Sequence, residues 1–322
     1  MDALTKRPQP VMLSKRANVF YLEHAKVMQE GERVVFLTQD GGAFERMFNV
    51  PERNTAFLLL GKGTSITDAA ARRLAASNVI VGFCGSGGSP LFETTDVAFM
   101  QPQSEYRPTA YMQSWCKLWL NEHDRLETAK LFLKHRVNLT LLNWTTNSFL
   151  KKKGISLEEK NVENFVADVD RATDVTGLLL VEGRFTKMLY SIMASGCSMD
   201  FVRVPGKENQ GKRPAEKANA FLDHGNYIAY GYAAVVLNGL GISYAFPVLH
   251  GKTRRGALVF DIADLYKDGI VLPLAFECAA NGTNQQEFRT RLIERCQRIG
   301  LLDHVFGFVK GVCEEYALKT VT

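Results

Sequence analysis

The sequence predicts an α+β fold in which a small, mostly β domain of residues 1–100 precedes a larger, all-helical domain of residues 101–322. Two domains are expected because the chain has 322 residues and a domain holds about 150. Before residue 100, short apolar runs alternate with turn residues, as they do in strands. After residue 108, apolar residues recur at helical spacing. The composition, 46% hydrophobic and 23% charged, excludes a disordered chain.

The first domain is expected to be a sandwich-like set of short strands with one helix. Residues 39–42, Gln-Asp-Gly-Gly, have the composition of a turn because glycine accepts a positive φ. A helix is expected over residues 68–76, with Thr64 and Ser65 as its capping residues. Short strands at this spacing favour a sandwich. The segments with strand character, rich in Val, Phe and Leu, are residues 11–22, 25–29, 33–38, 55–60 and 79–83.

The second domain is expected to be a helical bundle joined to the first by residues 102–108. Trp115, Leu118 and Trp119 stand at positions i, i+3 and i+4, and the pattern predicts one long amphipathic helix that continues to Phe149. Further helices are expected over residues 157–173, 175–199, 214–240, 261–280, 287–299 and 302–318.

Charge and cysteine content exclude several classes of protein. Lys and Arg number 39 against 34 Asp and Glu, a surplus that permits a polyanionic partner without requiring one. The six cysteines contain no C-x-x-C pair, which argues against a zinc ribbon and a disulfide framework. The N-terminal residues lack the apolar core of a secretory signal, so a cytoplasmic location is expected. The uncharged residues 225–249 contain Asn, Gly and Pro, which favours a buried helix and an extended segment over a membrane span.

Two glycine-bearing segments imitate nucleotide-binding motifs without completing them. In residues 82–90, Pro90 stands where a dinucleotide-binding fingerprint has its third glycine, so a tight turn between strands is expected. Residues 251–253, Gly-Lys-Thr, look like the end of a phosphate loop. Phe246 occupies the place of the required earlier glycine, and ATP hydrolysis is therefore not expected.

Glu182 and His250 are the first candidates for chemistry. Glu182 lies four residues after Leu178 and three before Phe185, so it borders the apolar face of its helix. A carboxylate there must be paired, hydrogen-bonded, metal-bound or protonated, and a bridge to a neighbouring Arg is the plain alternative. His250 ends the uncharged stretch, where a purely structural histidine is the alternative.

The residues that follow His250 make a catalytic site more plausible. Asp261 and Asp264 share a helix face at i, i+3, and Asp268 adds i+7. Asp261 near an N-cap could complement the helix dipole, but this does not explain the other two acids. Carboxylates and a neutral imidazole suit Mg²⁺ or Mn²⁺, and nearby basic side chains suit phosphate, so the set predicts phosphodiester chemistry. The basic side chains are Lys252, Arg254 and Arg255.

Four segments resemble one known family over essentially the full length of the chain. Residues 248–265, VLHGKTRRGALVFDIADL, resemble the C-terminal motif of the Cas1 family of CRISPR adaptation integrases. Residues 219–231, NAFLDHGNYIAYG, match the helix that precedes the histidine in that family, and residues 181–183, VEG, match its E-G signature. Residues 104–108, SEYRP, and the residues of the C-terminal motif are most similar to the type I-F branch of the family.

The resemblance implies a role for each matching residue. Glu182, His250 and Asp264 take the places of three metal ligands, and Asp261 is a nearby auxiliary acid. Tyr230 would help to place the DNA end, and Asn219 would support the site from the same helix. Phosphate contacts rest on charge alone, and residues 203–217 fit a DNA-contacting loop and a solvated one equally well. The proposed DNA contacts are Lys252, Arg254, Arg255, Arg203, Lys212, Arg213 and Asn219.

The implied activity is that of a metal-dependent DNA endonuclease and integrase of CRISPR adaptation. The 3′-hydroxyl of a short DNA fragment, the spacer, would attack a phosphodiester at the repeat border of the CRISPR array. Strand transfer exchanges one phosphodiester for another and needs no ATP. The working unit implied by the resemblance is a homodimer formed through the β domains. Two dimers would flank a Cas2 partner, which in this branch is fused to the Cas3 helicase-nuclease.

Two other functions remain open from the sequence. The chain could only hydrolyse branched or single-stranded nucleic acid, or it could be a non-catalytic subunit that bridges DNA and dimerises through its β domain. A strand-transfer assay with 3′-OH fragments separates joining from hydrolysis. Loss of activity on substitution of Glu182 and Asp264 separates catalysis from bridging.

Overall fold

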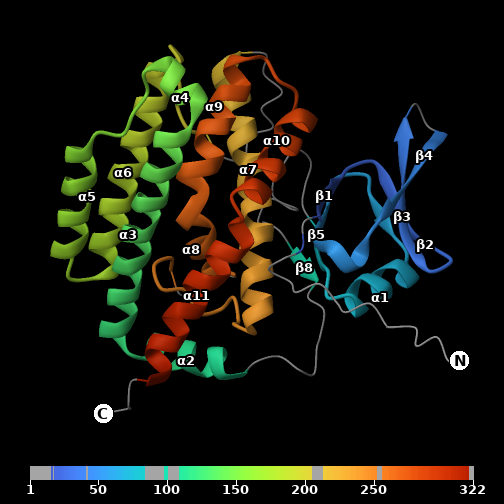
Figure 1. Cartoon of the computed structure of the whole chain (residues 1–322), viewed down its shortest axis with the longest axis horizontal. Coiled ribbons are helices and arrows are strands. Elements are labelled where there is room, and N and C mark those ends of the chain that lie inside the picture. The colour runs from blue at the N-terminus through green and yellow to red at the C-terminus, as the bar shows by residue number, and fades with distance from the viewer. Residues whose placement is uncertain are drawn as a thin grey trace, which may run out of the picture.

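The structure is a computed structural model that describes residues 16, 18–40, 43–83, 98–100, 109–204, 213–251 and 256–318. A strand-rich N-terminal part is followed by a helical C-terminal part, which stand side by side in Figure 1. The predicted α+β class is confirmed. The segments of residues 84–90 and 102–108 lie outside the described residues, as do residues 11–15 and 17 of the first expected strand.

Within the described residues, the N-terminal part contains two four-stranded sheets and one α-helix. One sheet has the order β1-β5-β7-β8, with β1, β5 and β7 parallel and β8 antiparallel; the other has the order β4-β3-β2-β6. Helix α1 (Asp68–Ala76) is capped by the Thr67 hydroxyl, which accepts the Ala70 N–H, rather than by Thr64 or Ser65. The strands are β1 (Asn18–Leu22), β2 (Ala25–Glu30), β3 (Arg33–Asp40), β4 (Ala43–Val50), β5 (Thr55–Leu60), β6 (Ser65–Ile66), β7 (Ile80–Phe83) and β8 (Ala98–Met100).

Strand β4 is absent from the strands expected from the sequence. It pairs antiparallel with β3, from Val34 opposite Val50 to Asp40 opposite Ala43. Glu45, Arg46 and Asn49 interrupt its apolar pattern, so the alternation that marks a half-buried strand is weak. The hydrogen bonds to β3, the preceding strand of the same hairpin, therefore decide this strand.

All six residues of strand β5 are buried, because the strand lies between two hydrophobic cores. Leu58 and Leu60 belong to the core shared by both sheets and α1, whereas Phe57 and Leu59 belong to the core of the helices. Side chains alternate across a strand, so one strand serves both cores. The Phe57 ring meets Tyr232 of α7 (Pro214–Leu240) edge-on, with centroids 5.1 Å apart.

Gly231 of α7 leaves room for the Phe57 ring of β5. A Cβ at residue 231 would stand 2.4 Å from Phe57 Cε2. Gly231→Ala is therefore expected to lower the free energy of unfolding by about 1–3 kcal/mol through overpacking. Urea unfolding would measure this. The matched control is Gly307→Ala in α11 (Leu301–Leu318), where a Cβ meets nothing within 4 Å and the change should be neutral or stabilising. Equal stability of the two variants would contradict the tight packing.

The described C-terminal part is helical. Its first helices are α2 (Thr109–Leu120), α3 (Glu122–Thr146) and α4 (Ser148–Lys153). The prediction of one helix to Phe149 is wrong, because Asn121 and Asn147 each start a new helix as N-caps. Asn121 Oδ1 accepts the N–H groups of residues 123 and 124, and Asn147 Oδ1 those of residues 149 and 150. The remaining helices near the surface are α5 (Glu159–Arg171), α6 (Val175–Gly196) and α10 (Gln285–Arg298).

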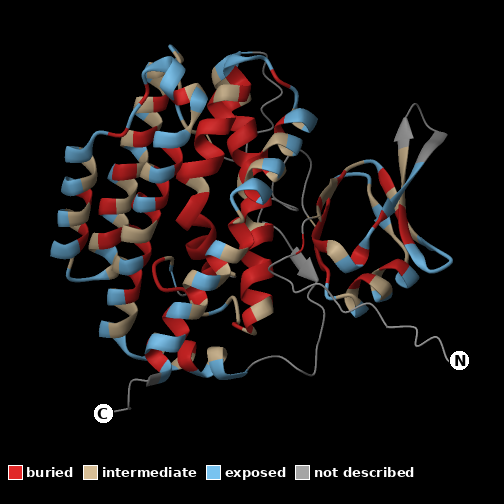
Figure 2. Cartoon of the chain, viewed as in Figure 1, coloured by how far each residue is buried: buried red, intermediate tan, exposed pale blue. Residues whose placement is uncertain are grey.

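Helix α7 lies between the other helices and strand β5 and is buried along almost its whole length, as Figure 2 shows. The chain after it is non-helical, as expected, and leads to His250. Trp115 donates from its indole to the carbonyl of Phe246, and Trp119 to that of Pro247. Helix α2 thereby fixes the segment before the histidine. Of the helices described, none is both long and apolar enough to cross a membrane.

The expected helix of residues 261–280 has three parts: α8 (Ala257–Tyr266), a π-helical turn η4 (Lys267–Val271) and α9 (Leu272–Ala280). Asp261 is therefore the fifth residue of α8 and not near its N-cap, which is Gly256 with a φ of 67°. Pro273 has no N–H to donate into the turn before it, which favours a wider turn there.

Candidate functional site

Asp261 fixes the backbone on either side of His250. Its carboxylate accepts the N–H groups of Val248, Leu249 and His250 at 2.7, 3.1 and 3.0 Å. The His250 ring nitrogen Nδ1 lies 2.6 Å from Asp261 Oδ1. Because that oxygen can only accept when ionised, we assign the imidazole proton to Nδ1, which leaves the lone pair on Nε2. Asp261 thus orients the histidine rather than facing the reacting groups.

Asp264 stands on the other side of the imidazole. His250 Nε2 lies 3.6 Å from Asp264 Oδ2, and Lys267 makes an ion pair with Oδ1 of the same carboxylate. Burial alone would raise the pKa of Asp264, but the charges of Lys267 and Arg136 outweigh it and lower that pKa. Burial alone would lower the pKa of His250, but its bond to Asp261 and the charge of Asp264 outweigh this and raise that pKa. A cation beside this pair is thus electrostatically favoured.

Tyr230 of α7 packs beside these groups, as expected for a residue near the site. Its ring lies 5.3 Å from the Lys267 ammonium and meets Phe260 edge-on at 4.7 Å. Burial would lower the pKa of Lys267, but Asp264 raises it, so the ammonium stays charged.

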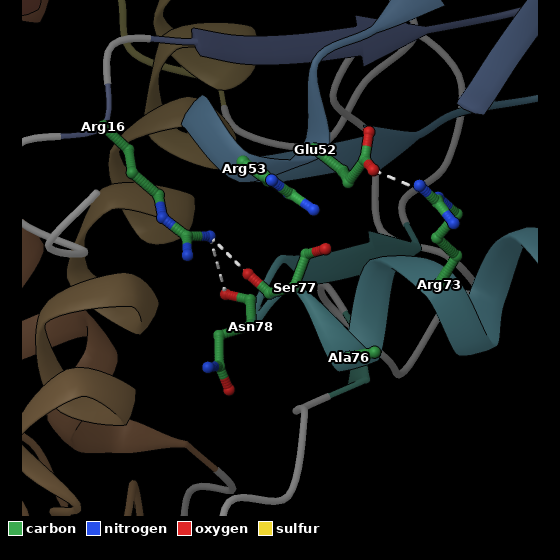
Figure 3. Close-up of a pocket in the computed structure, with 7 residues that line it drawn as sticks. All are labelled: Arg16, Glu52, Arg53, Arg73, Ala76, Ser77 and Asn78. Atoms are coloured by element: carbon green, nitrogen blue, oxygen red, sulfur yellow. Dashed lines mark hydrogen bonds and ion pairs between the residues drawn. The ribbon is translucent and has the colours of Figure 1, made fainter. Parts of the chain in front are cut away.

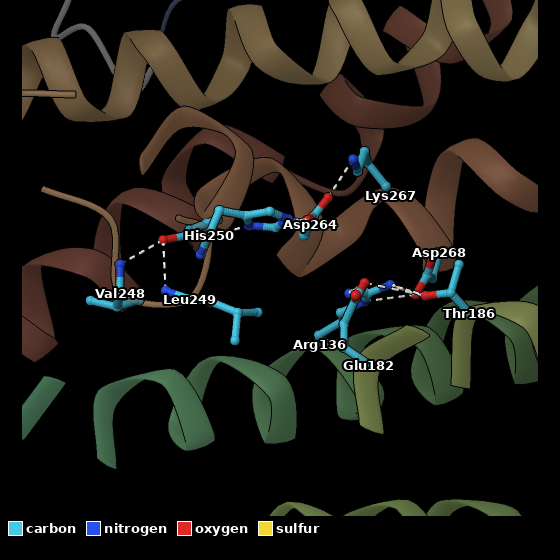
Figure 4. A network of polar contacts seen from close by, with 10 residues as sticks. Arg136, Glu182, Thr186, Val248, Leu249, His250, Asp264, Lys267 and Asp268 are labelled. Carbon is cyan, nitrogen blue, oxygen red and sulfur yellow. Dashed lines mark hydrogen bonds and ion pairs between the residues drawn. The ribbon is translucent and has the colours of Figure 1, made fainter. Parts of the chain in front are cut away.

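Arg136 of α3 is the central residue that sequence reasoning missed (Figure 4). Its guanidinium donates to Glu182 Oε1 at 2.6 Å, to Asp268 Oδ2 at 2.7 Å and to Thr186 Oγ1 at 2.8 Å. Burial would lower the pKa of Arg136, but the carboxylates of Asp268, Glu182 and Asp264 raise it. The plain alternative for Glu182, a bridge to a neighbouring Arg, is what the structure contains. In the sequence, Arg136 falls between Leu133 and Val137 on one apolar stripe of its helix, and this position could have indicated a buried arginine.

The predicted site residues therefore converge only in part. His250 lies within 3.6 Å of both Asp261 and Asp264, whereas Glu182 belongs to a second group with Arg136 and Asp268, which acts on Asp264 through the charge of Arg136. Among the residues that the structure describes, no three His, Cys, Asp or Glu side chains are placed around one metal position. The network holds four carboxylates against one guanidinium and one ammonium, so two negative charges are in excess when His250 is neutral. The oxygen and imidazole donors and the negative charge fit a hard divalent cation. To bind such a cation, Glu182 would have to give up its hydrogen bond with Arg136.

The proposed DNA contacts lie in different surroundings. Arg203 pairs with Asp223 at 2.5 Å and donates to Asn219 at 3.1 Å, while Asn219 also accepts the Val204 N–H. Both are thus engaged in holding the chain before α7. Arg213 is exposed and pairs with the neighbouring Glu216. Lys212, Lys252, Arg254 and Arg255 lie outside the described residues.

A separate pocket of about 350 Å³ lies in the N-terminal part (Figure 3). Arg16 forms one wall by donating to the carbonyls of Thr55 and Ser77 at 3.0 and 2.6 Å, and Arg73 pairs with Glu52. The residues that line it include no member of the His250 network, so it is not part of the candidate site.

The fold and this site define an α+β protein whose helical part holds a buried cluster of carboxylates and an imidazole. The family model of the CRISPR associated protein Cas1 matches residues 20–297, which is most of the chain. The chain belongs to the Cas1 family. It is 42% identical over 313 residues to the CRISPR-associated endonuclease Cas1 of Pseudomonas aeruginosa (strain UCBPP-PA14), covering 94% of this chain and 95% of the relative.

Solved structures of other proteins share the fold. The Cas1 protein TM1797 of Thermotoga maritima superimposes with a TM-score of 0.74 at 15% identity, covering 94% of this chain and 98% of that one. A casposase bound to integration product superimposes with a TM-score of 0.72 at 14% identity, covering 95% and 92%. At these identities the likeness concerns the fold.

Proposed function

We propose that the chain is a divalent-metal-dependent DNA endonuclease and integrase that inserts short DNA fragments into a CRISPR array. The proposal is carried by one observation: His250 Nε2 lies 3.6 Å from Asp264 Oδ2, at a buried position where carboxylates outnumber cations. The endonuclease name of the Pseudomonas relative and the casposase bound to integration product agree with this reaction class.

His250, Asp264 and Glu182 would hold Mg²⁺ or Mn²⁺, because oxygen and imidazole ligands suit these ions. The bound cation would supply Lewis-acid stabilisation of the charge that develops on the attacked phosphate. Asp261 keeps the proton on His250 Nδ1, so that Nε2 presents its lone pair. Tyr230 borders the same space and would position the DNA end.

The reaction exchanges one ester for another. The 3′-oxygen of the fragment forms a bond to phosphorus while a phosphorus–oxygen bond of the repeat border breaks. The attacking hydroxyl loses a proton and the departing 3′-oxygen gains one. The number of phosphodiesters is unchanged, so no ATP is needed. With water as the attacking group, the same site would cut DNA.

DNA would be held mainly through its phosphates. Arg213 is exposed at the start of α7, and Lys212, Lys252, Arg254 and Arg255 supply further positive charge in the sequence. Such contacts make affinity fall with salt and depend little on base sequence. The working unit that we propose is a homodimer joined by the N-terminal parts, with a Cas2 partner fused to Cas3.

A strand-transfer assay tests this function. Fragments with 3′-OH ends and a supercoiled plasmid that carries a CRISPR array are mixed with the protein and its Cas2 partner in Mg²⁺, in Mn²⁺ or in EDTA. Joined products are expected with either metal, and none in EDTA. Fragments with 3′-deoxy ends should not be joined, because they lack the attacking hydroxyl.

The outcomes separate the three candidate functions. Nicked plasmid without joined product would favour the hydrolytic nuclease. DNA binding with neither cutting nor joining would favour the bridging subunit. Joining that persists in EDTA would contradict the metal site.

A further inference from the structure

Arg136 is a single buried cation shared by two carboxylates from different elements. Its side chain is 4% exposed, and it binds Glu182 of α6 and Asp268 of η4 (Figure 4). A guanidinium is always charged, so a buried one needs an ionic partner at all times. Two partners are more than this requirement demands.

The two carboxylates are held unequally. Asp268 Oδ2 receives two nitrogens of Arg136, at 2.7 and 2.6 Å, whereas Glu182 Oε1 receives one. The Asp268 side chain is 8% exposed, against 18% for Glu182. Glu182 also has one more rotatable bond than an aspartate. Its contact is therefore the easier of the two to exchange.

The backbone around Asp268 is fixed by its neighbours on α3. The Trp144 indole donates to the Asp268 carbonyl at 2.9 Å. Gly269 packs against the α3 backbone, where a Cβ would stand 3.0 Å from the carbonyl oxygen of Leu139. The π turn thus seats Asp268 directly beside the helix that carries Arg136, and away from His250.

We propose that Asp268 is a positioning residue that keeps the Arg136 guanidinium paired when Glu182 leaves it for a divalent cation beside His250 and Asp264. Without Asp268, the release of Glu182 would leave a buried guanidinium with no ionic partner. With Asp268, Arg136 loses one of three ionic contacts and keeps two. The inference rests on the proposed function, since it assumes that Glu182 becomes a metal ligand.

Mn²⁺ binding to the metal-free protein, measured by calorimetry without DNA, tests the role of Asp268. Asp268→Asn is expected to raise the Mn²⁺ dissociation constant at least about tenfold, because Glu182 becomes the only carboxylate left for Arg136. The matched control is Asp170→Asn, which removes a carboxylate that pairs with Lys134 of the same helix α3 at 2.5 Å and should leave the constant unchanged. Equal constants for the two variants would overturn the inference.

A second arm separates positioning from simple loss of charge. In the Arg136→Gln background no guanidinium competes for Glu182, so adding Asp268→Asn should change the Mn²⁺ dissociation constant by less than about twofold. The same weakening in both backgrounds would mean that Asp268 acts by charge alone. A crystal structure of the natural sequence with Mn²⁺ should retain the Arg136–Asp268 contact and lack the Arg136–Glu182 contact. Retention of both contacts would overturn the inference even if the variants do not fold.

These results also distinguish failure of the role of Asp268 from failure of the proposed metal site. If the natural sequence binds no Mn²⁺, or Glu182→Gln binds it unchanged, the proposed metal site fails. If Glu182→Gln weakens binding and Asp268→Asn does not, the metal site stands and only the role of Asp268 fails.

Discussion

Asp264→Asn is expected to reduce the joining of 3′-OH fragments at least about 10³-fold, while the protein remains folded. The neutral amide no longer offers an ionised oxygen beside His250 Nε2, from which it is separated by 3.6 Å. The amide also leaves the Lys267 ammonium without its ionised partner, so stability should fall as well, and rates are compared between folded proteins. Initial rates of strand transfer at saturating Mg²⁺ measure the effect, and circular dichroism checks the fold.

Asp170→Asn serves as the control for this loss of one carboxylate. Asp170 pairs with Lys134 at 2.5 Å on the partly exposed surface of α5 and α3, and its substitution should leave the joining rate within about twofold. An Asp264→Asn variant that retains more than a tenth of the activity would contradict the assigned role of this carboxylate.

Asp261→Asn is expected to lower the free energy of unfolding by about 2–4 kcal/mol. The carboxylate accepts three backbone N–H groups and the His250 ring, and an amide has only one oxygen to replace two. Each buried donor left without an acceptor costs about 1–3 kcal/mol. Urea unfolding in the absence of metal and DNA measures this, and Asp170→Asn should unfold like the natural sequence.

The comparison of Asp261→Asn with Asp264→Asn tests whether these two acids of α8 have separate roles. Asp261 should affect stability together with activity, because it holds the segment that carries His250. Unchanged stability with a complete loss of joining would instead place Asp261 among the groups that touch the reacting phosphate.

Local sequence patterns predicted several elements well. Helix α7 runs from Pro214 to Leu240, the bounds expected from its starting proline and its long apolar run. The α+β class likewise follows from the change in periodicity near residue 100. Where a polar side chain could bond its own backbone, the pattern failed: Asn121 and Asn147 start new helices within a periodic stretch.

The sequence also supplied the residue types of the candidate site, since the segment from His250 to Asp264 carries the imidazole and two carboxylates within a short stretch. It did not show which role each carboxylate has. Asp261, Asp264 and Asp268 share a face at i, i+3 and i+7 of a regular helix, but the π turn after Tyr266 gives Asp268 a different partner. A widened turn leaves no periodic mark in the sequence.

Local periodicity and short contiguous motifs were enough to predict the fold class, the helical course of the second half and the family to which the chain belongs. Contacts that form only in the folded chain establish strand β4, the bonds of Asp261 with the backbone before His250, and the pairing of Arg136 with Glu182 and Asp268. Arg136 lies 46 residues from Glu182 and 132 from Asp268 along the chain. Pairing of buried charges over such separations is set by the packing of whole helices, which no local pattern records.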